Sequence, residues 1–170
     1  MKLRAVVGDL AGQPADAVVR VVAPSRRRVP DDELGLLRAA GPAARDALDE
    51  LVRLEHGTAL PPGRALSTTA GDLPARWLVH VCAPAYRVSG SGEHLVASAY
   101  RAVLAAADAV GARTLALAPI GMTQPYWPLD VSTRLVTATL GNSPTRVREA
   151  ALVVRTPAAL AVLETALARG

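Results

Sequence analysis

Hydrophobic residues in this chain gather in short runs bounded by glycine, proline and charged residues. Runs of strand length with few polar residues are typical of strands buried on both faces, as in a parallel sheet covered by helices. The pattern predicts strands at Lys2–Val7, Ala17–Ala23, Ala65–Thr69, Trp77–Ala83, Thr114–Ile120 and Val147–Arg155.

Between these runs, apolar residues recur at helical spacing and capping residues stand at the segment ends. Gly41 is expected to end one helix and Pro42 to begin the next, because proline has no N–H to lose in a first turn. The alternation of strand and helix after residue 90 predicts parallel pairing and a layered α/β domain. Helices are predicted over 31–40, 42–56, 93–110, 128–140 and 157–168.

The stretch Thr114–Pro128 combines a buried strand, a loop and a helix start. In an open α/β sheet, ligands bind outside the carboxyl ends of the strands. The free N–H groups and the dipole of a helix N-terminus favour an anion. We therefore expect any ligand of this chain to bind at this stretch.

Composition narrows the possible classes of protein. With 170 residues and a 51% apolar share, the chain has the size of a single domain, expected over 1–170, with a core of small aliphatic side chains. Its one cysteine, Cys82, excludes an internal disulfide and a multi-thiolate metal site. Without an apolar span of ~20 residues or a signal-peptide core, the expected location is cytoplasmic.

Most of the motifs that carry chemistry are missing from the sequence. His56, His80 and His94 have no metal-ligand spacing, so no metal site is expected. His80 and Cys82 share a strand face, where core packing explains both. The chain contains no Gly-x-Ser-x-Gly elbow, no phosphate loop with Lys and no Gly-x-Gly-x-x-Gly fingerprint, and no cofactor is expected.

Three features are candidates for ligand contacts. The net charge is +4, and Arg26–Arg28 form a local basic run that suits phosphate but lacks the nearby aromatics that nucleic-acid binding favours. A solvated loop explains such a run equally well. In the pair Tyr126-Trp127, one ring is expected to stack on a ligand and the other to cover the core edge. Asp9, after a strand, could accept hydrogen bonds from an amino group or simply form a turn.

Taken together, these segments resemble the macrodomain family, an ADP-ribose-binding α/β/α module. The resemblance lies in an unbroken order of local motifs over nearly the whole chain. Tyr100 also stands where the family has an aromatic residue in a helix. The matching segments are Val7–Leu10, Ala15–Val19, Arg38–Pro42, Gly63–Pro74, Leu78–Pro84 and Thr114–Pro128. The fold it implies is three-layered, with a central mixed, largely parallel sheet of about six strands.

The departures from the family pattern fall on its binding and catalytic segments. The Asn-Ala-Ala-Asn motif is replaced by Arg20–Ala23, and the Gly-rich phosphate loop by Ser25–Glu33. A backbone phosphate cradle needs glycines, which this second segment lacks. In the other phosphate loop, Ser-Thr-Gly becomes Gly121–Thr123, followed by Gln124–Pro125. The aromatic end, Tyr126–Pro128, is kept.

The resemblance implies a divergent macrodomain with a degenerate active site that binds ADP-ribose or a related adenine nucleotide, free or attached to protein. Hydrolysis is expected to be weak or lost, and neither nucleic acid nor membrane is an expected partner. One alternative is an ADP-ribosyl hydrolase or O-acetyl-ADP-ribose deacetylase with Asp31, Asp32 or Glu33 as base. Another is a scaffold that acts through protein contacts. The expected ligand-binding residues are Asp9, Leu10, Ala23, Arg26, Arg27, Arg28, Gly121, Met122, Thr123, Gln124, Tyr126 and Trp127.

Overall fold

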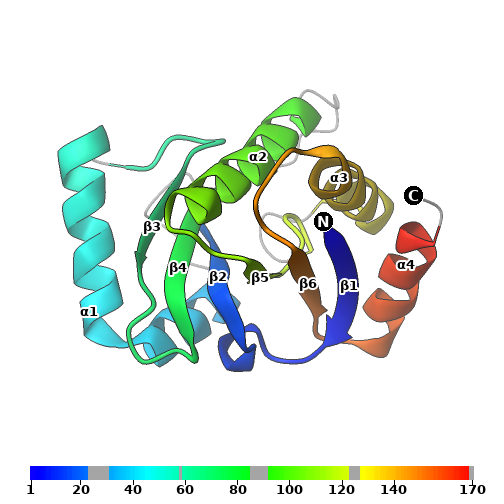
Figure 1. Ribbon diagram of the computed structural model, residues 1–170, viewed down its shortest axis with the longest axis horizontal. Helices are drawn as coiled ribbons and strands as arrows, with labels where there is room; N and C mark the ends of the chain where they lie inside the picture. The colour runs from blue at the N-terminus through cyan, green and yellow to red at the C-terminus, as the bar shows by residue number, and fades with distance from the viewer. Residues whose placement is uncertain (23–30, 58, 85–91, 123–126, 169–170) are drawn as a thin grey trace.

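Three layers make up the molecule, with one central sheet between two layers of helices (Figure 1). The structure, a computed structural model, describes residues 1–22, 31–57, 59–84, 92–122 and 127–168, without the side chains of 31–34 and 56. Helix α1 covers one face of the sheet, and helices α2, α3 and α4 cover the other. The expected α/β class is confirmed.

The sheet has six strands in the order β1-β6-β5-β2-β4-β3. All neighbouring strands pair in parallel except β3, which runs antiparallel to β4 at one edge. The mixed, largely parallel sheet is therefore as expected. Its strands are β1 (Lys2–Val7), β2 (Ala15–Val22), β3 (Ala65–Thr69), β4 (Ala75–Cys82), β5 (Thr114–Leu117) and β6 (Glu149–Val154).

The helices follow the predicted segments closely, with one short 3-10 helix, η1 (Leu10–Gly12), in addition. They are α1 (Asp31–His56), α2 (Glu93–Ala109), α3 (Leu129–Asn142) and α4 (Pro157–Leu167). Helix α1 is two helices joined at a kink, because Gly41 has φ 78° and Pro42 follows it. The predicted helix stop and restart at this pair are confirmed.

Most boundaries differ from the prediction by one to three residues, and two of these differences lie around the loop between β5 and α3. Strand β5 ends at Leu117 rather than Ile120, since Pro119 has no N–H for a ladder bond and the Ile120 N–H donates to a side chain instead. Pro128 is the N-cap of α3 and not its first helical residue. Both differences lengthen the connection from β5 to α3, which is the segment expected to bind a ligand.

The core is divided by the sheet into two sides. The α1 side is built around Val18, Leu78 and Ala116, and the opposite side around Val19, Leu115 and Leu152 under α2, α3 and α4. Cys82 is fully buried beside α1, so the prediction that it packs in the core is confirmed. None of the helices among the described residues is long and apolar enough to cross a membrane.

Candidate functional site

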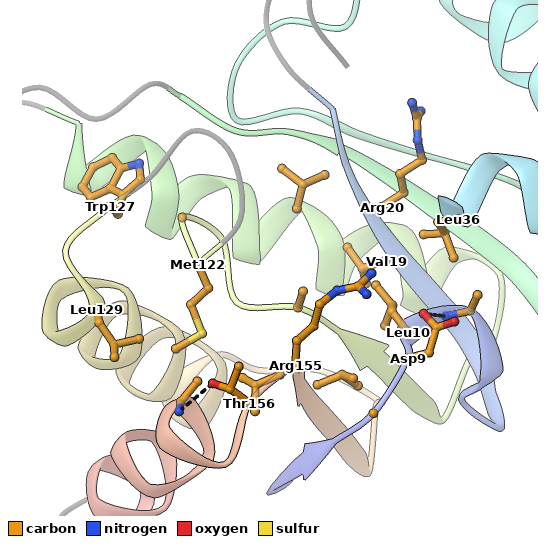
Figure 2. A pocket seen from close by; sticks show the side chains of 18 residues that line it. Asp9, Leu10, Val19, Arg20, Leu36, Met122, Trp127, Leu129, Arg155 and Thr156 are labelled. Atoms are coloured by element: carbon orange, nitrogen blue, oxygen red, sulfur yellow. Dashed lines mark hydrogen bonds between the residues drawn. The ribbon is translucent and has the colours of Figure 1, made fainter. Parts of the chain in front are cut away.

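A pocket of about 290 Å³ opens at the carboxyl ends of the parallel strands (Figure 2). It lies between β2 and β5, which are neighbours in the sheet. After β2 the chain continues on the β4 side of this point, and after β5 it continues to β6 on the opposite side. Such a reversal of direction is where open α/β sheets bind ligands. Its lining residues include Asp9, Leu10, Val19, Arg20, Leu36, Ala118, Gly121, Met122, Trp127, Leu129, Val153, Arg155 and Thr156.

Asp9 and Leu10 stand at one end of this pocket, directly after β1. The Asp9 carboxylate caps η1 by accepting a hydrogen bond from the Ala11 N–H at 3.3 Å. The Gln13 side chain donates to the Asp9 carbonyl oxygen at 2.9 Å. The two interpretations of Asp9, as a turn residue and as an acceptor for a ligand's amino group, are both compatible with the structure. Asp9 forms a turn and also lines the pocket with an exposed carboxylate.

Gly121 and Trp127 form another wall. Gly121 has φ 92°, and a Cβ there would lie 2.6 Å from Cδ1 of the Trp127 indole. The Trp127 backbone N–H donates to the Gly121 carbonyl oxygen at 2.8 Å, and its indole N–H to the Pro84 carbonyl oxygen at 3.3 Å. Trp127 is only 5% exposed, so it packs in the core while lining the pocket.

Buried side chains support the turn after β5. The Ile120 N–H donates to the Tyr100 hydroxyl oxygen at 2.7 Å, and the Ser132 hydroxyl donates to the Ile120 carbonyl oxygen at 3.0 Å. Tyr100 is fully buried, and burial raises the pKa of its hydroxyl, so the group stays neutral. These bonds satisfy both polar backbone groups of Ile120 and fix the backbone that leads to Gly121.

A buried polar network lies on the α1 side of the pocket. Arg20, only 4% exposed, pairs in register with the fully buried His80, and their side chains approach to 3.4 Å between Nη1 of Arg20 and Nδ1 of His80. The Thr68 hydroxyl donates to the Thr69 carbonyl oxygen and lies 2.9 Å from His80 Nε2. Thr68 therefore accepts from Nε2–H, which leaves Nδ1 as the acceptor facing Arg20.

His80 stays neutral in this network. Burial, and secondarily the Arg20 charge, lower the pKa of His80 to about 3. A neutral imidazole can accept from the guanidinium, whereas an imidazolium would repel it. Arg20 therefore lines the pocket as a cation, and the His80 side chain that it contacts is neutral.

Sequence reasoning missed Arg155 and Thr156, which follow β6 and also line the pocket. Thr156 is also the N-cap of α4, because its hydroxyl accepts from the Ala159 N–H at 3.2 Å. The signal that could have found Arg155 is its place at the carboxyl end of a predicted parallel strand. Figure 2 shows its guanidinium extending toward Val19 and Leu10.

The expected ligand-binding residues divide into two groups. Those that the structure describes all line the pocket, namely Asp9, Leu10, Gly121, Met122 and Trp127. Those outside the described residues are Ala23, Arg26, Arg27, Arg28, Thr123, Gln124 and Tyr126. The side chains of Asp31, Asp32 and Glu33 are also outside the description.

The described lining limits the chemistry of this pocket. It is mostly apolar, with one carboxylate, Asp9, and two guanidinium groups, Arg20 and Arg155. Among the described residues, no cluster of His, Cys, Asp or Glu could hold a metal ion. A second, more open hollow of about 1040 Å³ lies between α3, α4 and the start of β1, away from the strand ends.

Comparisons with known proteins agree on one family. The sequence profile described as Macro domain matches residues 33–136. A macro domain-containing protein of Streptomyces coelicolor is 36% identical over 149 residues, which is 88% of each chain. A protein of an Enterobacter species named O-acetyl-ADP-ribose deacetylase is 30% identical, over 85% of this chain and 80% of that one.

Solved structures match the fold. A mutant of the Oceanobacillus iheyensis macrodomain superposes with a TM-score of 0.90 at 22% identity, covering 98% of this chain and 87% of that one. Two structures of the same macrodomain, one a mutant described with ADPR and one described with ADP, superpose with a TM-score of 0.89. At such identities the likeness supports the fold alone.

Proposed function

Since this chain belongs to the Macro domain family, we propose that it binds ADP-ribose or a related adenine nucleotide in the pocket at the carboxyl ends of its strands. The observation that carries the proposal is the position of the pocket between β2 and β5, with Asp9 at one end. Neighbours of the same fold are described with ADPR and with ADP. The ligand could be free or attached to another protein.

Asp9 has the chemistry to recognise the base of such a ligand. Its carboxylate is exposed, borders the pocket and can accept a hydrogen bond from an exocyclic amino group. The capping bond to Ala11 and the Gln13 contact hold it in position, so less conformational entropy is lost on binding. Leu10, beside it, offers an apolar surface to the ring.

The proposed activity is binding, with weak or no hydrolysis. Arg20 occupies a buried position on β2, where the family resemblance implies an amide that assists hydrolysis. Its guanidinium faces His80 and has no lone pair with which to accept a proton. Within the described lining, Asp9 is the only carboxylate, and it lies at the end proposed to hold the base.

A second candidate function is O-acetyl-ADP-ribose deacetylation, which the name of the Enterobacter relative favours. The assay is acetate release from O-acetyl-ADP-ribose by the wild-type protein. Turnover by the wild type that is lost in the triple variant Asp31→Ala/Asp32→Ala/Glu33→Ala would support the deacetylase function. Absence of turnover, together with measurable ligand binding, would leave the binding module.

Titration calorimetry with ADP-ribose tests the proposed function. The wild type is expected to bind at one site, and Asp9→Ala to bind about 10- to 150-fold more weakly, because a hydrogen bond to a charged group is worth about 1.5–3 kcal/mol. Asp49→Ala, an exposed acidic position on α1 outside the pocket, is the control and should leave affinity unchanged. Equal affinity of all three proteins would remove Asp9 from the site.

A further inference from the structure

The amino ends of the strands, at the edge of the sheet opposite to the pocket, carry a group of cations. Lys2 begins β1, Arg148 directly precedes β6, and Arg113 directly precedes β5. Arg146 lies in the same loop as Arg148, and its carbonyl oxygen accepts a hydrogen bond from the Arg113 guanidinium at 3.0 Å. All four residues are exposed, and together they are called the basic edge.

Backbone hydrogen bonds hold three of these residues in a row. The Arg148 N–H donates to the Arg113 carbonyl oxygen at 2.7 Å, and the Lys2 N–H donates to the Arg148 carbonyl oxygen at 2.8 Å. Figure 1 shows the start of β1 beside the loop that leads into β6. Neighbouring strands lie about 4.8 Å apart, so the row extends over about 10 Å of the sheet edge. The sheet itself therefore fixes the spacing of these backbones.

The acidic residues near the basic edge have other partners. Glu149 pairs with Arg4, and the carboxylates of Asp108 and Asp16 accept hydrogen bonds from backbone N–H groups. Within the described ranges, no carboxylate forms an ion pair with a side chain of the basic edge. Its four cations outnumber the carboxylates of Asp108 and Asp16, so the surface is net positive. That charge is available to an anionic partner.

The composition of the basic edge suits a phosphate backbone better than bases or a peptide. Single-stranded nucleic acid is held by stacking its bases on aromatic rings, and protein partners are anchored by buried aromatic or apolar side chains. Among the described residues, the one aromatic near these strand ends is Trp77, which is partly buried and has Arg76 over its ring at 5.4 Å. A duplex, in contrast, can be held through its phosphates alone.

We propose that the basic edge binds the phosphate backbone of duplex nucleic acid without reading its sequence. A row of about 10 Å covers about three phosphates of one strand. The six residues of β1 separate this edge from the pocket by about 20 Å, so both surfaces can be occupied at once. The proposal does not depend on the proposed function. It departs from the sequence-based expectation about nucleic acid, because only the strand order brings Lys2, Arg113 and Arg148 together.

Fluorescence anisotropy with a labelled DNA duplex of random sequence measures this binding. Contact with about three phosphates predicts that the logarithm of the association constant falls with the logarithm of salt concentration with a slope of about −3. A duplex of unrelated sequence should bind equally well, and a single strand no more tightly. Absence of binding at about 100 µM protein and about 50 mM salt would contradict the proposal, because non-specific binding is stronger than this even at physiological salt.

Two double variants separate the charge of the basic edge from its structure. Arg113→Ala/Arg148→Ala should weaken duplex binding about 5- to 30-fold at about 50 mM salt and bring the slope to about −1. Arg113→Lys/Arg148→Lys keeps both charges and should stay within about 3-fold of the wild type. Thermal melting confirms that each variant is folded.

The matched control is Arg64→Ala/Arg101→Ala, which removes the same charge from exposed positions before β3 and in α2. Its duplex affinity should stay within about 3-fold of the wild type, since neither residue contacts the phosphates. If the alanine pair at the basic edge weakens binding no more than this control does, the binding is a property of the overall charge and the proposal is wrong.

Competition at constant ionic strength tests whether the two surfaces are separate. Saturating ADP-ribose should leave the duplex affinity unchanged, and displacement of the duplex would place it in the pocket and overturn the proposal. Binding of a polyglutamate peptide in place of the duplex would also overturn it, in favour of an acidic protein segment. A protein that binds the duplex but not ADP-ribose contradicts only the proposed function, and the reverse result contradicts only the role of the basic edge.

Discussion

At the scale of single residues, Tyr100 supports the pocket through one hydrogen bond. Its hydroxyl oxygen accepts from the Ile120 N–H, which is buried and lies directly before Gly121. Tyr100→Phe would leave that N–H without its acceptor in the protein interior. An unsatisfied buried donor costs about 1–3 kcal/mol, so the free energy of unfolding should fall by that amount.

Urea unfolding measures this change. Thr165→Ala is a suitable control, because it removes an exposed hydroxyl that bonds only within α4, and it should alter stability by less than about 0.5 kcal/mol. If Tyr100→Phe is as stable as the control, the hydroxyl contributes nothing to the turn. A lower ADP-ribose affinity in Tyr100→Phe would show that the turn also shapes the pocket.

Single residues also mark the limit of sequence reasoning about the site. Asp9, Met122 and Trp127 could be predicted because each lies in or beside a recognisable strand-to-loop segment. The contact between Arg20 and His80 could not, because it depends on the register between β2 and β4, which a single sequence does not specify.

At the scale of elements, the kink of α1 fits against the turn between β3 and β4. The Asp72 N–H donates to the Ala40 carbonyl oxygen at 3.1 Å, just before the kink at Gly41. A Cβ at Gly71 would lie 1.9 Å from that same oxygen. The close approach explains why a glycine stands in the turn.

Gly71→Ala tests this contact against a matched control. Gly71 and Gly57 both have positive φ, 60° and 75°, but a Cβ at Gly57 would meet nothing within 4 Å. Gly57→Ala should therefore cost only about 1 kcal/mol of unfolding free energy for backbone strain. Gly71→Ala should cost about 1–3 kcal/mol more, since the backbone must also move apart. If chemical denaturation shows that both variants lose the same free energy of unfolding, α1 can move away from the turn at Gly71 at no cost.

The buried face of α2 shows what a local sequence pattern can predict about a helix and what it cannot. The residues Leu95, Ala99 and Val103 recur at helical spacing in α2, and the last two are buried while Leu95 is half-buried. The buried face is rotated toward Val96 and Tyr100 because α2 packs against both the sheet and α3, which broadens its apolar stripe. The existence of the helix was predictable, and its exact orientation was not.

At the scale of the whole molecule, the buried His80 couples folding to pH. Its folded-state pKa of about 3 lies below the ordinary value of 6.5, so the unfolded chain binds a proton that the folded protein does not. The contribution of neutral His80 to the free energy of unfolding is therefore fully present above about pH 6.5 and is lost as the pH falls toward 3. Hydrogen bonds from the Arg113 and Thr114 backbone lower the pKa of Asp16, whose contribution is lost only at more acid pH.

Urea unfolding between pH 7.5 and 4.5 measures the coupling. The wild type should lose stability over this range, by up to about 1.4 kcal/mol for each pH unit below 6.5. His80→Gln removes the titrating group and should flatten the profile, even though its stability at pH 7.5 is lower. The same slope in both proteins would assign the pH dependence to other groups.

The measurement that tests the central claim most directly is NMR mapping of ADP-ribose binding on the wild-type protein. Saturable shifts are predicted for the backbone amides around the pocket, above all at Asp9–Ala11, Gly121–Met122 and Arg155–Thr156. Residues of the hollow between α3 and α4, such as Thr137 and Thr165, should not move. No shifts at millimolar ADP-ribose, or shifts centred on that hollow, would contradict the account.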